Sequence, residues 1–74
     1  MRYAIVIEKA RNNFSAYVPD LPGCVSTGQT LKEVRKNIKD AVDFHLGGML
    51  EDGESLPAPS AVCEYVEPEV VFTG

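Results

Sequence analysis

Apolar and polar residues alternate in short runs over the first third of the chain, which is typical of half-buried strands. Residues 3–9 are rich in β-branched and aromatic types, and both of their alternating faces are largely apolar. We therefore predict a first strand that lies centrally in its sheet, with its second face covered. Residues 11–13 contain asparagines that tolerate left-handed backbone angles, and residues 14–18 alternate again. This arrangement predicts a β-hairpin.

A proline-containing turn separates the hairpin from a third short strand. Pro19 ends the second strand because it lacks the amide hydrogen that a ladder requires, and the run Asp20-Leu21-Pro22-Gly23 places a second proline and a glycine in a turn. We expect Gly23 to hold a positive φ or to allow a close backbone approach. Residues 24–27 predict the third strand, which ends at Gly28.

One long helix is predicted next, beginning with a capping box. In that motif the Thr30 hydroxyl accepts a hydrogen bond from the Glu33 amide, and the Glu33 carboxylate accepts one from the Thr30 amide. Apolar residues then recur at three- and four-residue steps, which predicts one buried face. These residues are Leu31, Val34, Ile38, Ala41, Val42, Leu46 and Met49, with His45 near the edge of the stripe.

The helix is predicted to end at about Glu51, with Gly53 in a left-handed cap and with the pair Gly47-Gly48 weakening the last turns. Residues 56–60 must be extended because each proline restricts its own backbone and that of the residue before it. Residues 61–66 alternate once more and predict a fourth strand.

These elements predict a single α+β domain over residues 1–74, in which an antiparallel sheet carries one helix on a face in the order β-β-β-α-β. Residues 67–74 are expected to form either an edge strand or exchanged arm at Val70-Val71-Phe72, or a flexible tail. A domain this short hides only about 60% of its unfolded surface, so we expect a homodimer or homotetramer.

Charge divides the chain into two parts. Residues 1–50 hold seven bases and five acids, whereas residues 51–74 hold six acids and no base, within a total of −4. An acidic surface disfavours nucleic acid and suits a basic protein partner, although solubility explains the acidic segment equally well. The candidate partner-binding residues are Glu51, Asp52, Glu54, Glu64, Glu67 and Glu69.

The sequence predicts no membrane span and no secretory signal, so we expect a cytoplasmic protein with no membrane partner. Cys24 and Cys63 are expected to be free thiols, and their spacing matches no zinc site. We predict no catalytic residue, metal or cofactor. The alternatives are a structural oligomer without a regulatory partner and, less favoured, a small enzyme or ligand-binding protein that uses Cys24 and His45.

Three runs of residues resemble the HicB family of antitoxins: 3–8, the stretch 20–34 that begins Asp20-Leu21-Pro22-Gly23-Cys24, and 53–59. The resemblance implies a partial RNase-H-like fold without catalytic acids, and a partner that is a small basic HicA-type toxin that cleaves mRNA. It also implies a short member without the C-terminal DNA-binding domain that many relatives carry. The residues of the motif are interpreted as mainly structural: Asp20, Pro22, Gly23, Gly28, Thr30 and Glu33.

Overall fold

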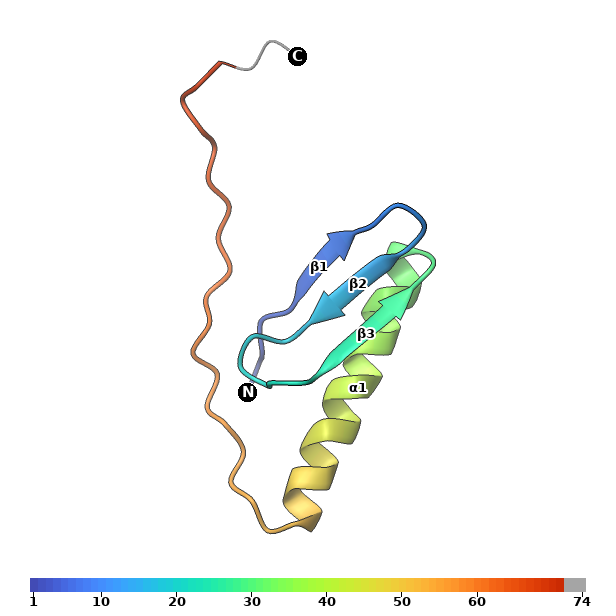
Figure 1. Cartoon of the computed structure of the whole chain (residues 1–74). Coiled ribbons are helices and arrows are strands. Elements are labelled where there is room, and N and C mark those ends of the chain that lie inside the picture. Colours follow the sequence, from blue (N-terminus) through green and yellow to red (C-terminus); the bar gives the residue numbers. More distant parts are fainter. Residues whose placement is uncertain (72–74) are drawn as a thin grey trace.

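Three short strands and one long helix form the folded body of the chain (Figure 1). The structure is a computed structural model, and it describes residues 1–71. The elements are β1 (Val6–Lys9), β2 (Phe14–Tyr17), β3 (Val25–Gly28) and α1 (Leu31–Glu51). The strands form an antiparallel sheet in the order β1-β2-β3, and α1 packs across one face of it. The predicted α+β class, with one helix on an antiparallel sheet, is confirmed.

The first strand is shorter than predicted and lies at an edge of the sheet. Its register with β2 runs from Val6 opposite Tyr17 to Lys9 opposite Phe14. Continuing that register would place residues 3–5 opposite 18–20, where Pro19 offers no amide and the chain turns away. The prediction of a central first strand is therefore wrong for the single chain, in which β2 is central.

The predicted hairpin is present, but its turn uses no left-handed asparagine. The turn is closed by the Ala10 amide, which donates to the Asn13 carbonyl at 2.8 Å. Among the described residues 1–71, only glycines have a positive φ, so the tolerance of asparagine for left-handed angles is not used in this turn.

The core is small, and part of it comes from the turn after β2. Leu21 and Cys24 from this turn are buried, and the turn is held by amide-to-carbonyl bonds from Leu21 to Val18 and from Cys24 to Leu21. Gly23, between them, has the predicted positive φ of 81°. The buried apolar residues are Ala16, Val18, Leu21, Cys24, Val34 and Ile38.

The start of α1 is capped largely as predicted. The Thr30 hydroxyl accepts from the Glu33 amide at 3.0 Å, but the Glu33 carboxylate accepts from the amide of Gln29, at 3.2 Å, and not from that of Thr30. Gly28 lies within β3, where a Cβ atom would come 2.5 Å from the Val34 amide nitrogen. The missing side chain lets α1 approach the strand closely.

The end of α1 also follows the prediction. Gly53 has a φ of 72°, its amide donates to the Leu50 carbonyl at 3.1 Å, and the Glu54 amide donates to the Met49 carbonyl at 2.9 Å. This pair of bonds is a Schellman motif. The helix runs without interruption through Gly47 and Gly48 to this cap.

The segment after the helix is extended and follows β1 at a distance (Figure 1). We call residues 61–71 the arm. No strand is assigned to the arm, so the predicted fourth strand at 61–66 is unpaired in the single chain and the order β-β-β-α-β is not confirmed. The described residues 67–71 likewise form no strand, and Phe72 lies outside the described residues.

Candidate partner-binding surfaces

The side chain of Asp20 fixes the point at which the arm begins. One carboxylate oxygen accepts from the Ser60 amide at 2.9 Å and from the Ala61 amide at 3.1 Å, and the other accepts from the Ser60 hydroxyl at 2.7 Å. These bonds join residues that are 40 positions apart in the chain. The motif residue Asp20 therefore has a long-range structural role in addition to its place in the turn.

The hydrogen bonds that Asp20 accepts favour the ionised form of its carboxyl group. The hydrogen bond from the Ser60 amide contributes most, and those from the Ser60 hydroxyl and the Ala61 amide add to it, so the pKa of Asp20 lies below the ordinary value of 3.8. The sequence carries no local signal for this contact, because Asp20 and Ser60 are 40 positions apart in the chain and neither lies in a helix or strand.

A second contact holds the segment that leads into the arm. The hydroxyl of Tyr3 donates to the carbonyl oxygen of Pro57. This hydrogen bond holds the start of the chain beside the segment that leads into the arm. This contact gives a role to the unpaired start of the predicted first strand.

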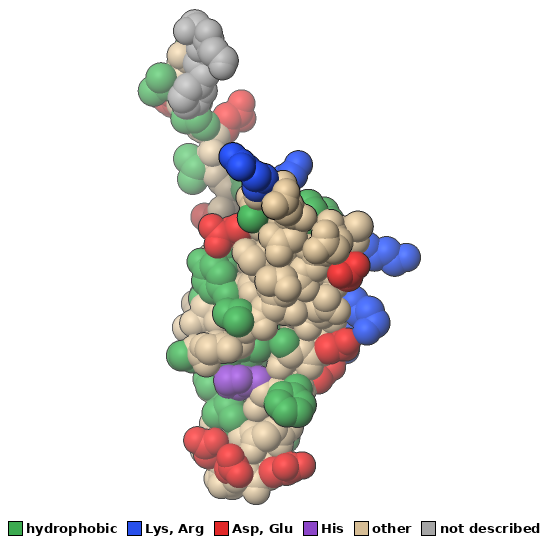
Figure 2. Space-filling view, turned by 45° about the vertical axis from the view of Figure 1, so that its right-hand side comes forward, with side chains coloured by type: hydrophobic (Ala, Val, Ile, Leu, Met, Phe, Trp, Pro, Cys, Tyr) green, Lys and Arg blue, Asp and Glu red, His purple; other side chains and the backbone are tan. Residues whose placement is uncertain are grey.

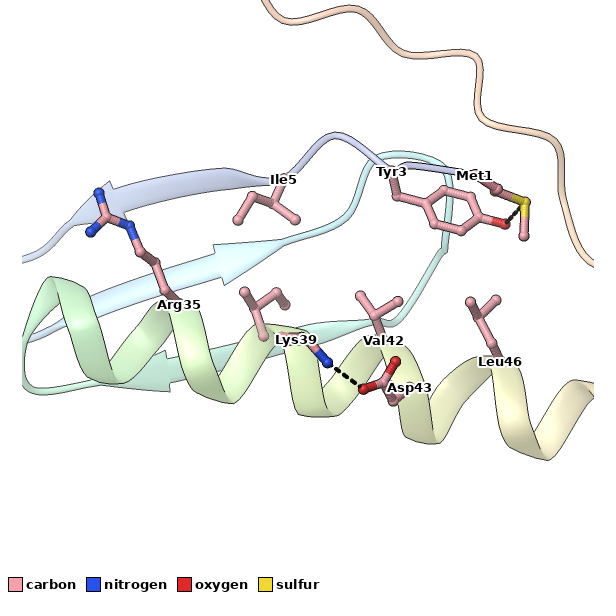
Figure 3. A pocket seen from close by; sticks show the side chains of 9 residues that line it. Met1, Tyr3, Ile5, Arg35, Lys39, Val42, Asp43 and Leu46 are labelled. Atoms are coloured by element: carbon pink, nitrogen blue, oxygen red, sulfur yellow. Dashed lines mark hydrogen bonds and ion pairs between the residues drawn. The ribbon is translucent and has the colours of Figure 1, made fainter.

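An apolar groove of about 300 Å³ lies between the first residues of the chain and α1 (Figure 3). Tyr3 and Ile5 form one wall, and Val42 and Leu46 of the helix form the other. The charged pair Lys39 and Asp43, whose side chains are 3.0 Å apart, borders it on the helix. The groove runs along α1 from Arg35 to Leu46, facing the residues that lead into β1.

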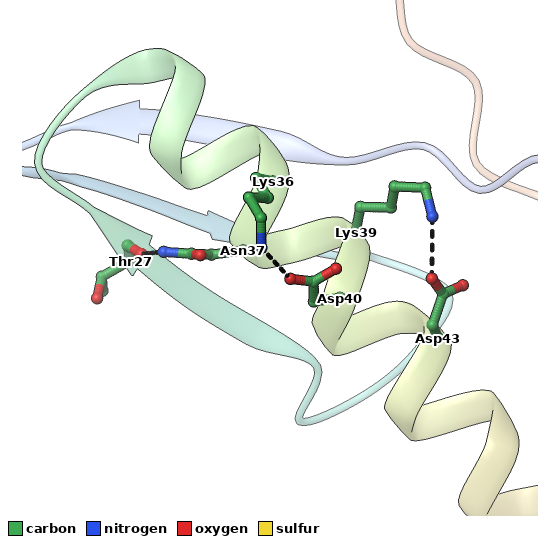
Figure 4. Close-up of polar contacts among 6 residues, drawn as sticks. All are labelled: Thr27, Lys36, Asn37, Lys39, Asp40 and Asp43. Carbon is green, nitrogen blue, oxygen red and sulfur yellow. Dashed lines mark hydrogen bonds and ion pairs between the residues drawn. The ribbon is translucent and has the colours of Figure 1, made fainter.

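Two ion pairs lie along the exposed surface of α1 (Figure 4). Lys36 pairs with Asp40 at 2.8 Å, and Lys39 pairs with Asp43. These exposed pairs raise the pKa of Lys39, chiefly through the hydrogen bond to Asp43, and lower the pKa of Asp40, chiefly through the hydrogen bond from Lys36. Two of the four basic residues of α1 are thus paired with acids.

One further contact on this face was not predicted. The side-chain amide of Asn37 donates to the Thr27 carbonyl at 2.8 Å (Figure 4). It fixes the helix to the end of β3.

The structure divides the six predicted partner-binding acids into two groups. Glu51 and Asp52 lie at the end of α1, with Glu54 just beyond its cap, and Figure 2 shows acidic side chains gathered at that tip of the molecule. The other three, Glu64, Glu67 and Glu69, are exposed along the arm. The helix end and the far part of the arm lie at opposite ends of the molecule (Figure 1). The six acids therefore form no single patch.

The two cysteines differ in environment. Cys24 is 4% exposed, and its burial raises the pKa of the thiol, which makes it a weak nucleophile at neutral pH. Cys63 is exposed in the arm, and both are free thiols, as predicted. His45 is half-buried on α1.

Residues 1–71 contain neither a metal-binding cluster nor a membrane-spanning helix. No three histidine, cysteine or acidic side chains lie close enough to hold a metal ion there. Within the same range, no helix is long and apolar enough to cross a membrane.

Relatives of the chain are found in phage and bacteria. A 14.9 kDa protein of the rep-hol intergenic region of Haemophilus phage HP1 is 47% identical over 93% of this chain and 53% of its own length. A UPF0150 protein of Helicobacter pylori is 47% identical over 64% of this chain and 65% of its own length. The chain thus spans about half to two thirds of these relatives.

A solved structure and a family model give the same assignment. A chain of the HicA3 and HicB3 toxin-antitoxin complex superimposes with a TM-score of 0.69 and 33% identity, over 81% of this chain and 70% of that one. The model of the HicB-like antitoxin of bacterial toxin-antitoxin systems matches residues 3–72. The chain therefore belongs to the HicB-like antitoxin family.

Proposed function

We propose that this protein is an antitoxin that binds a small basic toxin of the HicA type and neutralises it by occlusion, without catalysing a reaction. The observation that carries the proposal is the likeness in fold and sequence to a chain of the HicA3 and HicB3 complex. The buried, weakly nucleophilic Cys24 offers no support for the alternative of a cysteine enzyme.

The acidic end of α1 supports a basic partner. Glu51, Asp52 and Glu54 are exposed there, and the last turn of the helix contains no basic residue. The aligned peptide dipoles give a helix C-terminus a partial negative charge of about half an electron, which adds to the three carboxylates. We propose that this end attracts the basic surface with which the toxin contacts RNA and speeds their encounter.

We further propose that the protein is cytoplasmic and homo-oligomeric. In the assembled state the arm would provide the fourth strand, which would complete the β-β-β-α-β order of a partial RNase-H-like fold. The extended backbone of residues 61–66 and its alternating sequence support this proposal.

Co-expression tests the proposed function. The chain is produced together with a HicA-type toxin, sought first in the reading frame beside its gene, and growth and copurification on a tag fused to that toxin are measured. We expect growth to be restored and the two proteins to purify together. Continued growth arrest with no copurification would reject the proposal and favour a structural oligomer without a toxin partner.

A further inference from the structure

The arm and β1 are two unpaired edges on one molecule. β1 pairs only with β2, so its outer edge has no strand partner within residues 1–71. The arm is extended and unpaired, and its apolar side chains are open to solvent: Val62 is 80%, Tyr65 103% and Val66 89% exposed. Exposed strand edges and clustered apolar side chains are features that soluble proteins normally cover.

The overall dimensions also indicate that the single chain is incomplete. Its radius of gyration is 15.2 Å. A compact domain of this length is expected to have a value of about 11 Å. The excess comes from the arm, which extends away from the helix and sheet (Figure 1).

The arm runs in the same direction as β1, with space between them. Residues 61–63 share one cleft with residues 2–4, and residues 62–65 share a second with residues 5–7. The clefts measure about 460 and 370 Å³. Paired strands lie only about 4.8 Å apart and leave no such space, so the arm stands off from β1.

The first residues of the arm are fixed, which keeps this space open. Asp20 holds Ser60 and Ala61, and Tyr3 holds Pro57. With its start held at these contacts, the arm borders a slot whose opposite wall is the free edge of β1. Closing the slot within one chain would give a parallel pair, which is less stable per residue than an antiparallel one.

We propose that two copies of this chain exchange their arms, each arm entering the slot between β1 and the arm of the other copy. A two-fold axis between the arms makes the entering arm antiparallel to both of its new neighbours. The result is one continuous antiparallel sheet in the order β3-β2-β1-arm′-arm-β1′-β2′-β3′, where primes mark the second copy. Every edge described above gains a partner, and the assembly closes on itself.

Charge supports a second copy as the occupant. Arg2, Lys9 and Arg11 flank the free edge of β1, whereas the arm carries Glu64, Glu67 and Glu69. Antiparallel entry carries the later arm residues toward Arg2. A second copy provides both the acidic strand and the basic edge, so the contact between β1 and the entering arm is self-complementary in charge.

Mixed-label NMR of the full chain in reducing buffer tests the exchange. A mixture of ¹³C-labelled and ¹⁵N,²H-labelled chains is measured without any toxin, so the result is independent of the proposed antitoxin function. We expect contacts between copies that join the amides of residues 5–7 to side chains of residues 61–66. Analytical ultracentrifugation should show twice the 8.1 kDa chain mass, or an even multiple of it.

Two proline variants separate pairing of the arm from general damage. Glu64→Pro removes an amide donor within the exchanged strand of each copy, and dissociation of the dimer should increase about tenfold or more. The control, Ser55→Pro, alters an exposed residue before the Asp20 contact and should leave the mass unchanged. A monomeric wild type, a dimer whose arm contacts only its own β1, or equal dissociation of both variants would overturn the proposal. So would pairing of the arm that occurs only when the toxin is added.

Discussion

Asp20 connects two parts of the molecule that the sequence keeps far apart. It belongs to the turn that buries Leu21 and Cys24, and its carboxylate also accepts three hydrogen bonds from Ser60 and Ala61. The turn is built from local interactions, whereas the start of the arm is held by this side chain together with the Tyr3 contact to Pro57. The most recognisable run of the sequence therefore also determines where the arm lies.

Acidification should release the start of the arm. The pKa of Asp20 is lowered in the folded state, so the stabilisation is present above the ordinary value of 3.8 and is lost as the pH falls through the lower, folded-state pKa. NMR titration from about pH 6 to about pH 2 should move the Ser60 and Ala61 amide signals with one shared midpoint below that value.

Asp20→Asn is the matched variant for this titration. It keeps the shape of the side chain but removes the charge, so protection of the Ser60 and Ala61 amides from hydrogen exchange should fall at neutral pH, and the shared titration should disappear. Unchanged protection would show that the arm is held by other contacts.

Two glycine substitutions should act in opposite directions. Gly28→Ala places a Cβ against the backbone of Val34 and should destabilise the fold by about 1–3 kcal/mol. Gly47→Ala meets no atom within 4 Å in mid-helix and should stabilise by about 0.5–1 kcal/mol. Urea denaturation measures both values. A neutral Gly28→Ala would contradict the close approach of α1 to β3.

At the scale of elements, α1 is much longer than the sheet that it covers. Its 21 residues span about 31 Å, whereas strands of four residues span about 13 Å. The first half of the helix is buried against β2 and β3, and the second half leaves Val42 and Leu46 beside the groove. Burial therefore declines along a single apolar stripe.

Alanine substitutions along this stripe should show that gradient. Ile38→Ala removes a fully buried side chain and should cost about 2–5 kcal/mol, whereas Leu46→Ala, at the half-covered end, should cost about 1 kcal/mol or less. The free energies of unfolding, measured at equal protein concentration, give the comparison. Equal losses would mean that the helix end is covered in solution.

Local chemistry explains which elements were predictable. Thr30 with Glu33, and Gly53 after the helix, act within a few residues, so their patterns identify the ends of α1. The Asp20 contact joins residues 40 and 41 positions apart, for which a single sequence holds no local signal. The edge position of β1 depends on which strands pair in the folded sheet, which the pattern of β1 itself does not specify. The acidic segment was recognised by composition, but its division into two groups needed the fold.

For the whole molecule, the position of each acidic group predicts how it affects toxin binding. A triple variant with Glu51→Gln, Asp52→Asn and Glu54→Gln should slow association with a basic toxin about tenfold at low salt, because it removes the charge at the tip of α1. The matched triple variant, Glu64→Gln, Glu67→Gln and Glu69→Gln, removes the same charge from the arm and should slow association less. Stopped-flow rates at two salt concentrations provide the comparison, and identical rates would contradict a role for the helix end.

Inhibition of RNA cleavage tests the central claim most directly. The purified HicA-type toxin of the co-expression test is assayed on RNA while the chain is added in increasing amounts. An antitoxin that acts by occlusion predicts that cleavage falls linearly and ends at a fixed stoichiometric ratio, with no change in the RNA when the chain is present alone. Cleavage that continues unchanged in excess chain would contradict the account.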